Sequence, residues 1–250
     1  MKLIEIVEFL DDFLKIDEWE DKSNNGLQIE GRNEVNRIAF AVDACMDVFE
    51  RSKEIGADMI VVHHGLIWGG IDYVRGIIKR RIEFLLKNEI SLYAAHLPLD
   101  AHPSIGNNAQ ILKILGMDPV ERFGNYQGKE IGYIGVYDRE VSLKEVLKLI
   151  ESKLNPNLKV LRFGNEYVKR IGVVSGRGGF ALSEGIEKGL DLFITGEHDH
   201  SIYHLAKEGG INVVFAGHYA TETFGLKALM KVVGQEFDVD VKFVDCPTGL

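Results

Sequence analysis

One pattern of strand, helix and strand occurs twice in this chain, and the repeat limits the folds that the sequence can adopt. The first copy, RIAFAVDACMDVFERSKEIGADMIVVHHG, begins at Arg37, and the second, RIGVVSGRGGFALSEGIEKGLDLFITGEH, begins at Arg170. Aligned without a gap, the copies match apolar runs with one another and place Asp58 opposite Asp191. Apolar strands that alternate with helical stretches are typical of α/β proteins with buried sheets, so the repeat predicts two related α/β units.

The similarity continues at the next predicted strand of each copy. In LYAAHLPLD the strand ends at His96 and Asp100 follows four residues later, whereas in VFAGHYATE the strand ends at His218 and Glu222 follows four residues later. In open α/β sheets, ligands bind outside the carboxyl ends of the strands. If a pseudo-twofold axis relates the copies, their strand ends converge on one shared crevice, where we expect a functional site.

The alternation of strands and helices extends along the rest of the chain. Predicted strands cover residues 38–42, 59–62, 92–95, 131–136, 171–174, 192–194, 213–216 and 239–244. Helical spacing of apolar residues predicts an amphipathic helix in the N-terminal segment MKLIEIVEFLDDFLKIDEW, and further helices at residues 143–154, 183–189 and 222–233. The predicted fold class is therefore α/β.

Composition restricts the classes of function. The 250-residue chain has a formal net charge of -9, which opposes general binding to polyanions. Two short basic clusters, Lys79–Arg81 and Lys169–Arg170, are more typical of solvated faces, although nucleic acid could still bind through them. The cysteines, Cys45 and Cys246, give no disulfide framework and fit a reducing compartment, so we expect a cytoplasmic protein. No apolar stretch is long enough for a membrane span, so no membrane contact is expected.

Histidines and carboxylates gather at the ends of the predicted strands. The segment DMIVVHHGLIWGG ends an apolar run in two adjacent histidines, and the complete set is His63, His64, His96, Asp100, Glu197, His198, His200, His218 and Glu222. Taken singly, each has a structural explanation as a strand cap, an Asx turn, a solvated turn or a favourable acid in the first turn of a helix. Imidazole nitrogen together with carboxylate oxygen suits divalent cations, and there are enough donors here for two ions that share a bridging carboxylate. Because the residues recur at equivalent strand ends, the pattern favours metal binding.

Two polar segments are harder to interpret. The glycine-rich segment SGRGGF, residues 175–180, follows a predicted strand, and its amides could cradle a phosphate with Arg177 as counter-charge. It matches neither a P-loop nor a GxGxxG fingerprint, so a tight turn between strand and helix is the favoured interpretation. In SNNGLQIEG, residues 23–31, an Asn-Gly pair signals a turn before an amphipathic strand, and no sequence rule alone gives the segment a function.

Five motifs, SNNGLQIEG, IVVHHGLIW, HLPLDAHPSIGNNAQ, LFITGEH and FAGHYATETFG, follow one another along the chain. In this order they resemble the Ngg-one-interacting-factor-three-like family, whose members are also catalogued as GTP cyclohydrolase I type 2 homologues. The resemblance implies two intertwined α/β structural repeats with mixed sheets, a dinuclear metal centre in the cleft between them, and a homohexamer built as a trimer of dimers. Carried onto this sequence, the implied metal ligands are His63, His64, Asp100, His218 and Glu222.

The resemblance also implies a domain organisation. The first repeat is expected to span residues 1–125, completed by the C-terminal segment 226–250, and the second repeat to span residues 126–225. Some longer members of the family carry an inserted middle domain, for which the region from Glu121 to Lys169 leaves no room.

Two classes of function stay open. The first is a metal-dependent hydrolase acting on a nucleotide or another small cyclic amidine or amide; on GTP, hydrolysis would open the imidazole ring of guanine and release formate. Candidate general acid–base residues are His96, Glu197 and His198. The second class is a non-catalytic hexameric scaffold, containing metal, that binds nucleic acid or a regulatory protein partner. Histidine and carboxylate ligands do not separate zinc, iron and manganese, so a redox role also stays open if the ions are iron.

Overall fold

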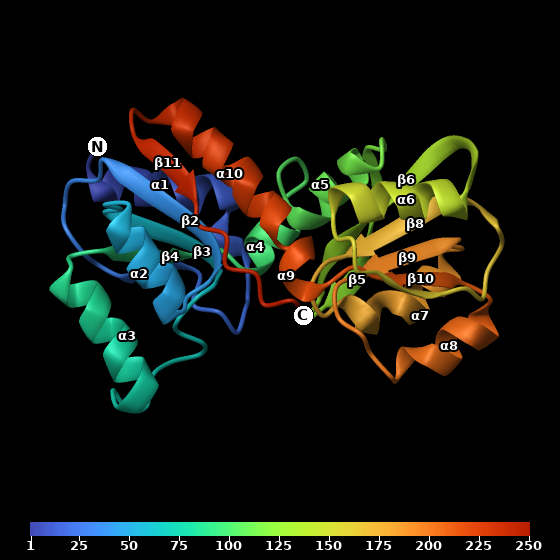
Figure 1. The fold of residues 1–250 in the computed structure, drawn as a ribbon, viewed down its shortest axis with the longest axis horizontal. Helices are drawn as coiled ribbons and strands as arrows, with labels where there is room; N and C mark the ends of the chain where they lie inside the picture. The colour runs from blue at the N-terminus through green and yellow to red at the C-terminus, as the bar shows by residue number, and fades with distance from the viewer. The chain divides into compact units, whose positions relative to one another are not determined.

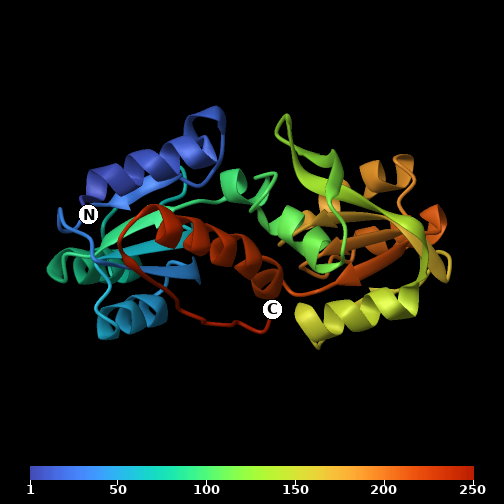
Figure 2. The same cartoon turned by 90° about the horizontal axis from the view of Figure 1, so that it is seen from above.

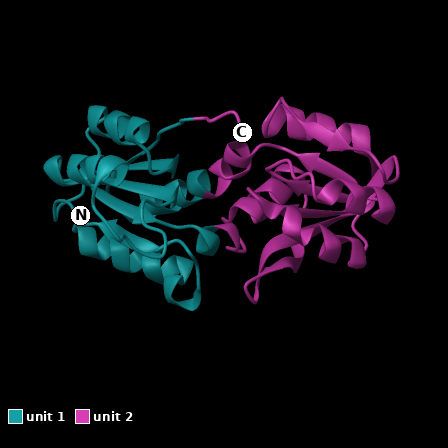
Figure 3. Cartoon of the chain, turned by 90° about the horizontal axis from the view of Figure 1, so that it is seen from below, with its two compact units in different colours: residues 1–99, 226–246 teal, residues 100–225, 247–250 magenta.

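The computed structural model describes all residues, 1–250, and the chain divides into two compact units. Unit 1 comprises Met1–Leu99 and Leu226–Cys246, and unit 2 comprises Asp100–Gly225 and Pro247–Leu250 (Figure 3). The chain therefore passes between the units after Leu99, after Gly225 and after Cys246, which makes the two α/β units intertwined, as predicted.

Unit 1 contains a five-stranded mixed sheet in the order β1-β4-β3-β2-β11. Its strands are β1 (Gly26–Ile29), β2 (Arg37–Asp43), β3 (Met59–His64), β4 (Ser91–Ala94) and β11 (Asp240–Phe243). Its helices are α1 (Leu3–Leu14), η1 (Ile16–Glu18), α2 (Met46–Glu54), α3 (Gly76–Lys87), α4 (Leu97–Asp100, which ends in unit 2) and most of α10 (Thr223–Glu236). Only β1 runs antiparallel to its neighbour, and helices cover both faces of the sheet (Figure 1). The central strands are buried on both faces, which explains their continuous apolar sequences.

Unit 2 contains a six-stranded mixed sheet in the order β5-β6-β8-β9-β10-β7. Its strands are β5 (Pro119–Tyr126), β6 (Lys129–Ser142), β7 (Lys159–Leu161), β8 (Tyr167–Val174), β9 (Leu192–Thr195) and β10 (Asn212–Phe215). Its helices are α5 (Asn107–Ile114), α6 (Leu143–Lys153), η2 (Gly178–Ala181), α7 (Leu182–Glu187), α8 (Ile202–Gly209) and α9 (His218–Thr221). The helix α6 lies on one face of this sheet, and α7 and α8 lie on the other (Figures 1 and 2).

The same hydrogen bonds recur at equivalent places in the two units. Strands β2, β3 and β4 are parallel neighbours in that order, and so are β8, β9 and β10. At the start of the third element of each copy, Asp58 accepts hydrogen bonds from the backbone amides of residues 36–37, and Asp191 accepts them from those of residues 169–170. The two aspartates that align in the sequence therefore hold the first strand of each copy in the same way.

The predicted strands and helices all occur in the structure; most differ by a few residues at their ends, and β6 continues to Ser142, well beyond the predicted end at residue 136. The edge strands β5 and β7 were not among the predicted strands. Unit 2 begins at Asp100, whereas the repeat boundary was expected after residue 125. The strand β5 pairs along its length with β6 and so belongs to the second sheet. At the other end, residues 226–246 complete unit 1, but Pro247–Leu250 belong to unit 2. None of the helices has the length and apolar character that crossing a bilayer requires.

Candidate metal centre

Three histidines of unit 1 form a group that could hold a metal ion. His63 and His64 end β3, and His96 follows β4 by two residues. Because β3 and β4 are parallel and adjacent, their carboxyl ends meet, and one ligand atom from each of the three rings lies within 4.8 Å of the others. The adjacent pair His63–His64 is therefore joined by a third imidazole that comes from the next strand.

The two adjacent histidines are oriented by hydrogen bonds at Nδ1. His63 is fully buried, and its Nδ1 lies 2.9 Å from the carbonyl oxygen of Ala95. A carbonyl oxygen can only accept, so Nδ1 of His63 donates this bond, and Nε2 is the ring nitrogen that would bind an ion. His64 Nδ1 lies 2.8 Å from Oδ1 of Asp43, at the end of β2. An acceptor on Nδ1 is the arrangement that metal-binding histidines use to present Nε2 to an ion, so the donors fit a divalent cation.

His96 has a similar partner, which sequence reasoning missed. Its Nδ1 lies 2.9 Å from Oδ2 of Asp21, and its backbone amide donates to Asn25 Oδ1 at 2.8 Å. Burial raises the pKa of Asp21, but hydrogen bonds from His96, Asn25 and the Ser23 amide outweigh it and lower the pKa to about 2. The carboxylate is therefore ionised at neutral pH. The SNNG segment thus positions His96; the Asn-Gly pair signalled a turn, but nothing in the sequence signalled this contact.

In unit 2, a histidine and a glutamate lie one helical turn apart. Nε2 of His218, the first residue of α9, lies 3.0 Å from Oε2 of Glu222, which is 3% exposed. Nδ1 of His218 lies 2.7 Å from Oε1 of Glu197. Burial lowers the pKa of His218, but hydrogen bonds and charge interactions with Glu222 and Glu197 have the larger effect, and together they raise the pKa to about 9. The two carboxylates thus create a strongly negative environment around this imidazole, which favours a bound cation.

Asp100 is buried in unit 2 and is held by two side chains. Its Oδ1 accepts hydrogen bonds from Asn107 Nδ2 at 2.8 Å and from Ser175 Oγ at 3.0 Å. Ser175 follows β8 and adjoins Gly176, which in turn approaches Glu222 closely. The same turn therefore contacts Asp100 and Glu222, the two carboxylates that the family resemblance implies as metal ligands.

The glycine-rich turn after β8 allows its backbone to lie close to the Glu222 carboxylate. Gly176 has a φ of +56°, and a β-carbon at this position would lie 2.1 Å from Oε1 of Glu222 and 3.2 Å from Nε2 of His218. Three amides of the turn already donate to side chains of the protein. Those of residues 175, 176 and 178 donate to the side chains of Asn108, Thr221 and Thr195, respectively. The turn interpretation of SGRGGF is thus supported over the phosphate cradle.

The remaining predicted residues lie at the end of β9. Glu197 orients His218 and faces Nε of Arg177 at 3.7 Å, whereas the His198 ring makes an edge contact with Phe215 at 5.1 Å. Both line a cavity of about 380 Å³ in unit 2, together with Asn155, Asn157, Phe215, three glycines and Leu250. His200 lies in the exposed turn that precedes α8.

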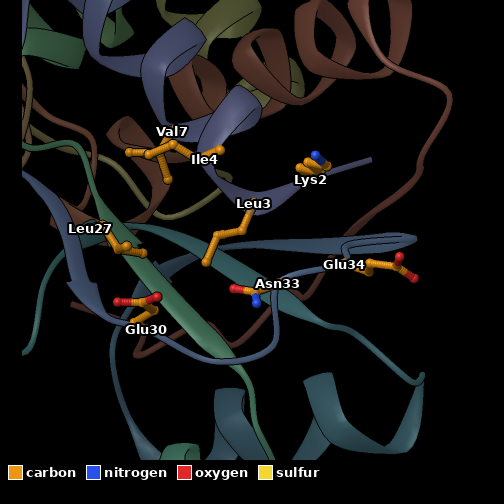
Figure 4. Close-up of a pocket in the computed structure, with 8 residues that line it drawn as sticks. All are labelled: Lys2, Leu3, Ile4, Val7, Leu27, Glu30, Asn33 and Glu34. Atoms are coloured by element: carbon orange, nitrogen blue, oxygen red, sulfur yellow. The ribbon is translucent and has the colours of Figure 1, made fainter.

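Another cavity, of about 340 Å³, lies in unit 1 beside the first turn of α1 (Figure 4). Apolar side chains of α1 and β1 line it, together with Lys2, Asn33 and two glutamates. Its lining includes no residue of the predicted site, whereas the cavity beside Glu197 is lined by two of them.

The basic cluster Lys169–Arg170 is partly used in packing. Arg170 forms an ion pair with Glu121 on β5 and donates to the carbonyl of Lys188, whose ammonium also contacts Glu121 at 2.8 Å. The pKa of Glu121 is lowered, chiefly by the hydrogen bond from Lys188 and next by that from Arg170. Because Arg170 is paired within the protein, the structure favours interpreting this cluster as a solvated face over interpreting it as a nucleic-acid site.

This lowered pKa predicts a pH dependence of stability. Because the folded-state pKa lies below its ordinary value of 4.5, the contribution of Glu121 is present above pH 4.5 and is lost as the pH falls through the folded-state value. Glu121→Gln should remove the part of the acid-induced decrease in the free energy of unfolding that comes from Glu121. That part is less than about 1 kcal/mol, because the charges are partly exposed. Urea unfolding at a series of pH values measures it, with the exposed Glu145→Gln as control. An unchanged pH profile for Glu121→Gln would contradict the assignment.

Comparisons with known proteins agree with the motifs. The chain matches the family described as Duf34/NIF3 (NGG1p interacting factor 3) over residues 1–248. It is 55% identical over 250 residues to a protein of Archaeoglobus fulgidus named GTP cyclohydrolase 1 type 2 homolog, and the match covers 100% of each. Two similar solved structures are the protein ybgI, described as of unknown function (TM-score 0.93, 34% identity, 99% of each chain covered), and TTHA1606 of Thermus thermophilus (TM-score 0.88, 38% identity, 100% of each chain covered). The resemblance inferred from five motifs is thereby confirmed: this chain belongs to the Duf34/NIF3 family.

Proposed function

We propose that this protein is a hydrolase that depends on divalent metal and acts on a nucleotide or another small cyclic amidine or amide. The proposed ligands, for two ions per chain, are His63, His64, Asp100, His218 and Glu222. The observation that carries the proposal is the orientation of the imidazoles, since each proposed histidine ligand has a hydrogen-bond acceptor at Nδ1. Relatives named GTP cyclohydrolase 1 type 2 homolog support a substrate of this class.

A pair of divalent ions would polarise the scissile group and lower the pKa of a water molecule. The residues of the chain would hold and orient this centre: Asp43 through His64, Glu197 through His218, and Ser175 through Asp100. Rigid support of this kind raises the basicity of the ligands and fixes their geometry.

The cavity beside Glu197 is of a size that suits a small-molecule substrate. Its volume of about 380 Å³ falls within the range of ligand pockets. Among the proposed acid–base residues, Glu197 and His198 line this cavity, so either could exchange a proton with a bound substrate. His96, held by Asp21, is proposed for the same role or as an additional ligand beside His63 and His64.

The experiment that tests the proposal is hydrolysis by the metal-loaded protein of GTP and a panel of purine nucleotides and cyclic amides, followed by ultraviolet absorbance and release of formate. Turnover that is lost in His63→Ala and retained in His204→Ala, an exposed histidine of α8, would support the hydrolase. Full metal occupancy with no turnover of any compound in the panel would favour the second candidate.

That second candidate is a non-catalytic homohexamer, a trimer of dimers, which binds nucleic acid or a protein partner. The observation that favours it is the surface of α3. Lys79 and Arg80 are exposed there, and Arg75, next to the first residue of the helix, lies over the ring of Tyr73 at 4.9 Å. Arginine and lysine beside an exposed aromatic ring are chemically suited to phosphate and bases.

For nucleic acid, this surface predicts a defined salt effect. If each cation contacts a phosphate, Lys79→Ala/Arg80→Ala should make the slope of log K against log salt shallower by about 2 for duplex DNA. Fluorescence anisotropy over a salt series measures the slope. The control is Lys207→Ala/Lys231→Ala, which removes the same charge from exposed positions elsewhere. Equal slopes for the two double variants would exclude α3 as the binding surface.

A further inference from the structure

The two cysteines of the chain lie at the same end of the unit 1 sheet. Cys45 precedes the first residue of α2, two residues after the end of β2, and Cys246 follows the end of β11 by three residues. Strands β2 and β11 are parallel neighbours, with Phe40 paired to Phe243. The chain segments that leave the two strands therefore begin side by side, although the cysteines are far apart in the sequence.

The contacts around the cysteines bring their thiols together. Both side chains are half-buried and pack against the same hydrophobic core of unit 1. Burial, and next the electrostatic interaction with the neighbouring Cys45, raise the pKa of the Cys246 thiol. Arg51 of α2 donates a hydrogen bond to the carbonyl of Asp245 at 2.8 Å, and the amide of Val244 donates to the carbonyl of Phe40 at 2.8 Å. These bonds fix the segment that leads to Cys246.

We propose that Cys45 and Cys246 are a site of reversible oxidation, at which a small-molecule disulfide converts the pair into an intramolecular disulfide bond. Because the two cysteines follow paired parallel strands and pack against the same core, we expect them to reach the short separation that such a bond requires while the sheet stays intact. A transient disulfide of this kind is compatible with a reducing compartment, where disulfides are regulatory or catalytic rather than structural. The proposal does not depend on the metal centre.

The reaction is an ordinary thiol–disulfide exchange in two steps. One cysteine, as thiolate, attacks the small disulfide, forms a mixed disulfide and releases the first small thiol. The second cysteine then attacks the protein sulfur of the mixed disulfide, forms the Cys45–Cys246 bond and releases the second small thiol. The protein loses two electrons and two protons, and the small disulfide gains both.

The test uses the full chain, first reduced and then incubated with oxidised glutathione as the probe. We expect the intact mass to fall by the mass of two hydrogen atoms, both thiols to become unreactive after unfolding, and a peptide that links Cys45 to Cys246 to appear. Dithiothreitol should reverse all three changes. Cys45→Ser and Cys246→Ser cannot complete the second step, so each should instead accumulate one glutathione adduct on its remaining thiol.

Three results would overturn the proposal. The first is wild-type protein that carries glutathione adducts but no internal link. The second is unmodified wild-type protein under conditions in which the single variants form adducts. The third is a disulfide between two chains, visible on a non-reducing gel. Circular dichroism of the reduced proteins shows whether the serine variants fold as the wild type does, since Ser and Cys have nearly the same shape.

Discussion

His63→Ala/Glu222→Ala is expected to bind divalent metal at least about 100-fold more weakly than the wild type, since losing even an orienting partner of a ligand costs about 10- to 100-fold. Both side chains are buried, His63 completely and Glu222 with only 3% of it exposed. Neither can therefore be replaced by a neighbouring surface group without a rearrangement. Alanine at both positions removes one nitrogen and one carboxylate of the proposed ligand set.

The measurement is elemental analysis after dialysis against a metal buffer, for zinc, iron and manganese in turn. We expect about two ions per chain in the wild type, as a dinuclear centre requires, and a large loss in the double variant. His204→Ala serves as the matched histidine control, because its side chain is exposed on α8. Equal metal contents in the wild type and the double variant would refute the proposed ligands.

Thermal unfolding measures the binding of metal to the same ligands independently. A metal that binds only the folded chain raises the unfolding temperature with its concentration. The wild type and His204→Ala should show this increase, whereas the double variant should unfold at a temperature that does not depend on added metal. A metal-dependent increase in the double variant would place the stabilising ion elsewhere.

Gly176→Ala should lower the free energy of unfolding by about 2 to 5 kcal/mol, as the sum of a left-handed backbone penalty and a steric clash. The φ of Gly176 is +56°, and the added β-carbon would meet Oε1 of Glu222 at 2.1 Å. Because Glu222 is itself held against His218, either the turn or the glutamate has to move. Metal binding should therefore weaken in the same variant.

Gly189→Ala provides a matched control in the same unit. Gly189 also has a positive φ, +69°, but a β-carbon there would have no atom within 4 Å. It should show only the backbone penalty, about 1 to 2 kcal/mol, and unchanged metal binding. Urea unfolding of both variants separates the two effects. If they lose the same free energy, the approach of Glu222 to the turn is not what requires glycine at position 176.

The fold class and the strand ends could be predicted because they depend on local patterns. The strand at residues 59–62 reads as buried because it is short, uncharged and rich in branched side chains, and the structure buries it. The alignment of Asp58 with Asp191 reflects a backbone interaction that both copies share. The strand β5 was missed because it contains Pro119 and Gly124, which are unfavourable in strands.

The partners that orient the candidate ligands could not be predicted. Asp21 lies 75 residues before His96, and no periodicity links a loop aspartate to a strand end that distant in sequence. The same holds for Ser175 and Asp100, which a tertiary contact brings together. Nor does any local pattern indicate that Cys45 and Cys246 meet, because their contact follows from the pairing of β11 with β2. A single sequence therefore predicts which residue types lie at the strand ends, but the side chains that contact them are determined by the tertiary fold.

The passage of the chain between the units has a consequence for how the protein is made. Residues 100–225 form nearly all of unit 2 as one continuous stretch, so this unit can fold as soon as they leave the ribosome. The sheet of unit 1 is completed later, since β11 comes from residues 240–243 and pairs with β2, which lies much earlier in the chain. Until residues 240–243 are synthesised, β2 exposes an unpaired edge to other nascent chains. The sheet of unit 1 is therefore completed only after the sheet of unit 2, and aggregation is most to be expected while the unit 1 sheet lacks β11.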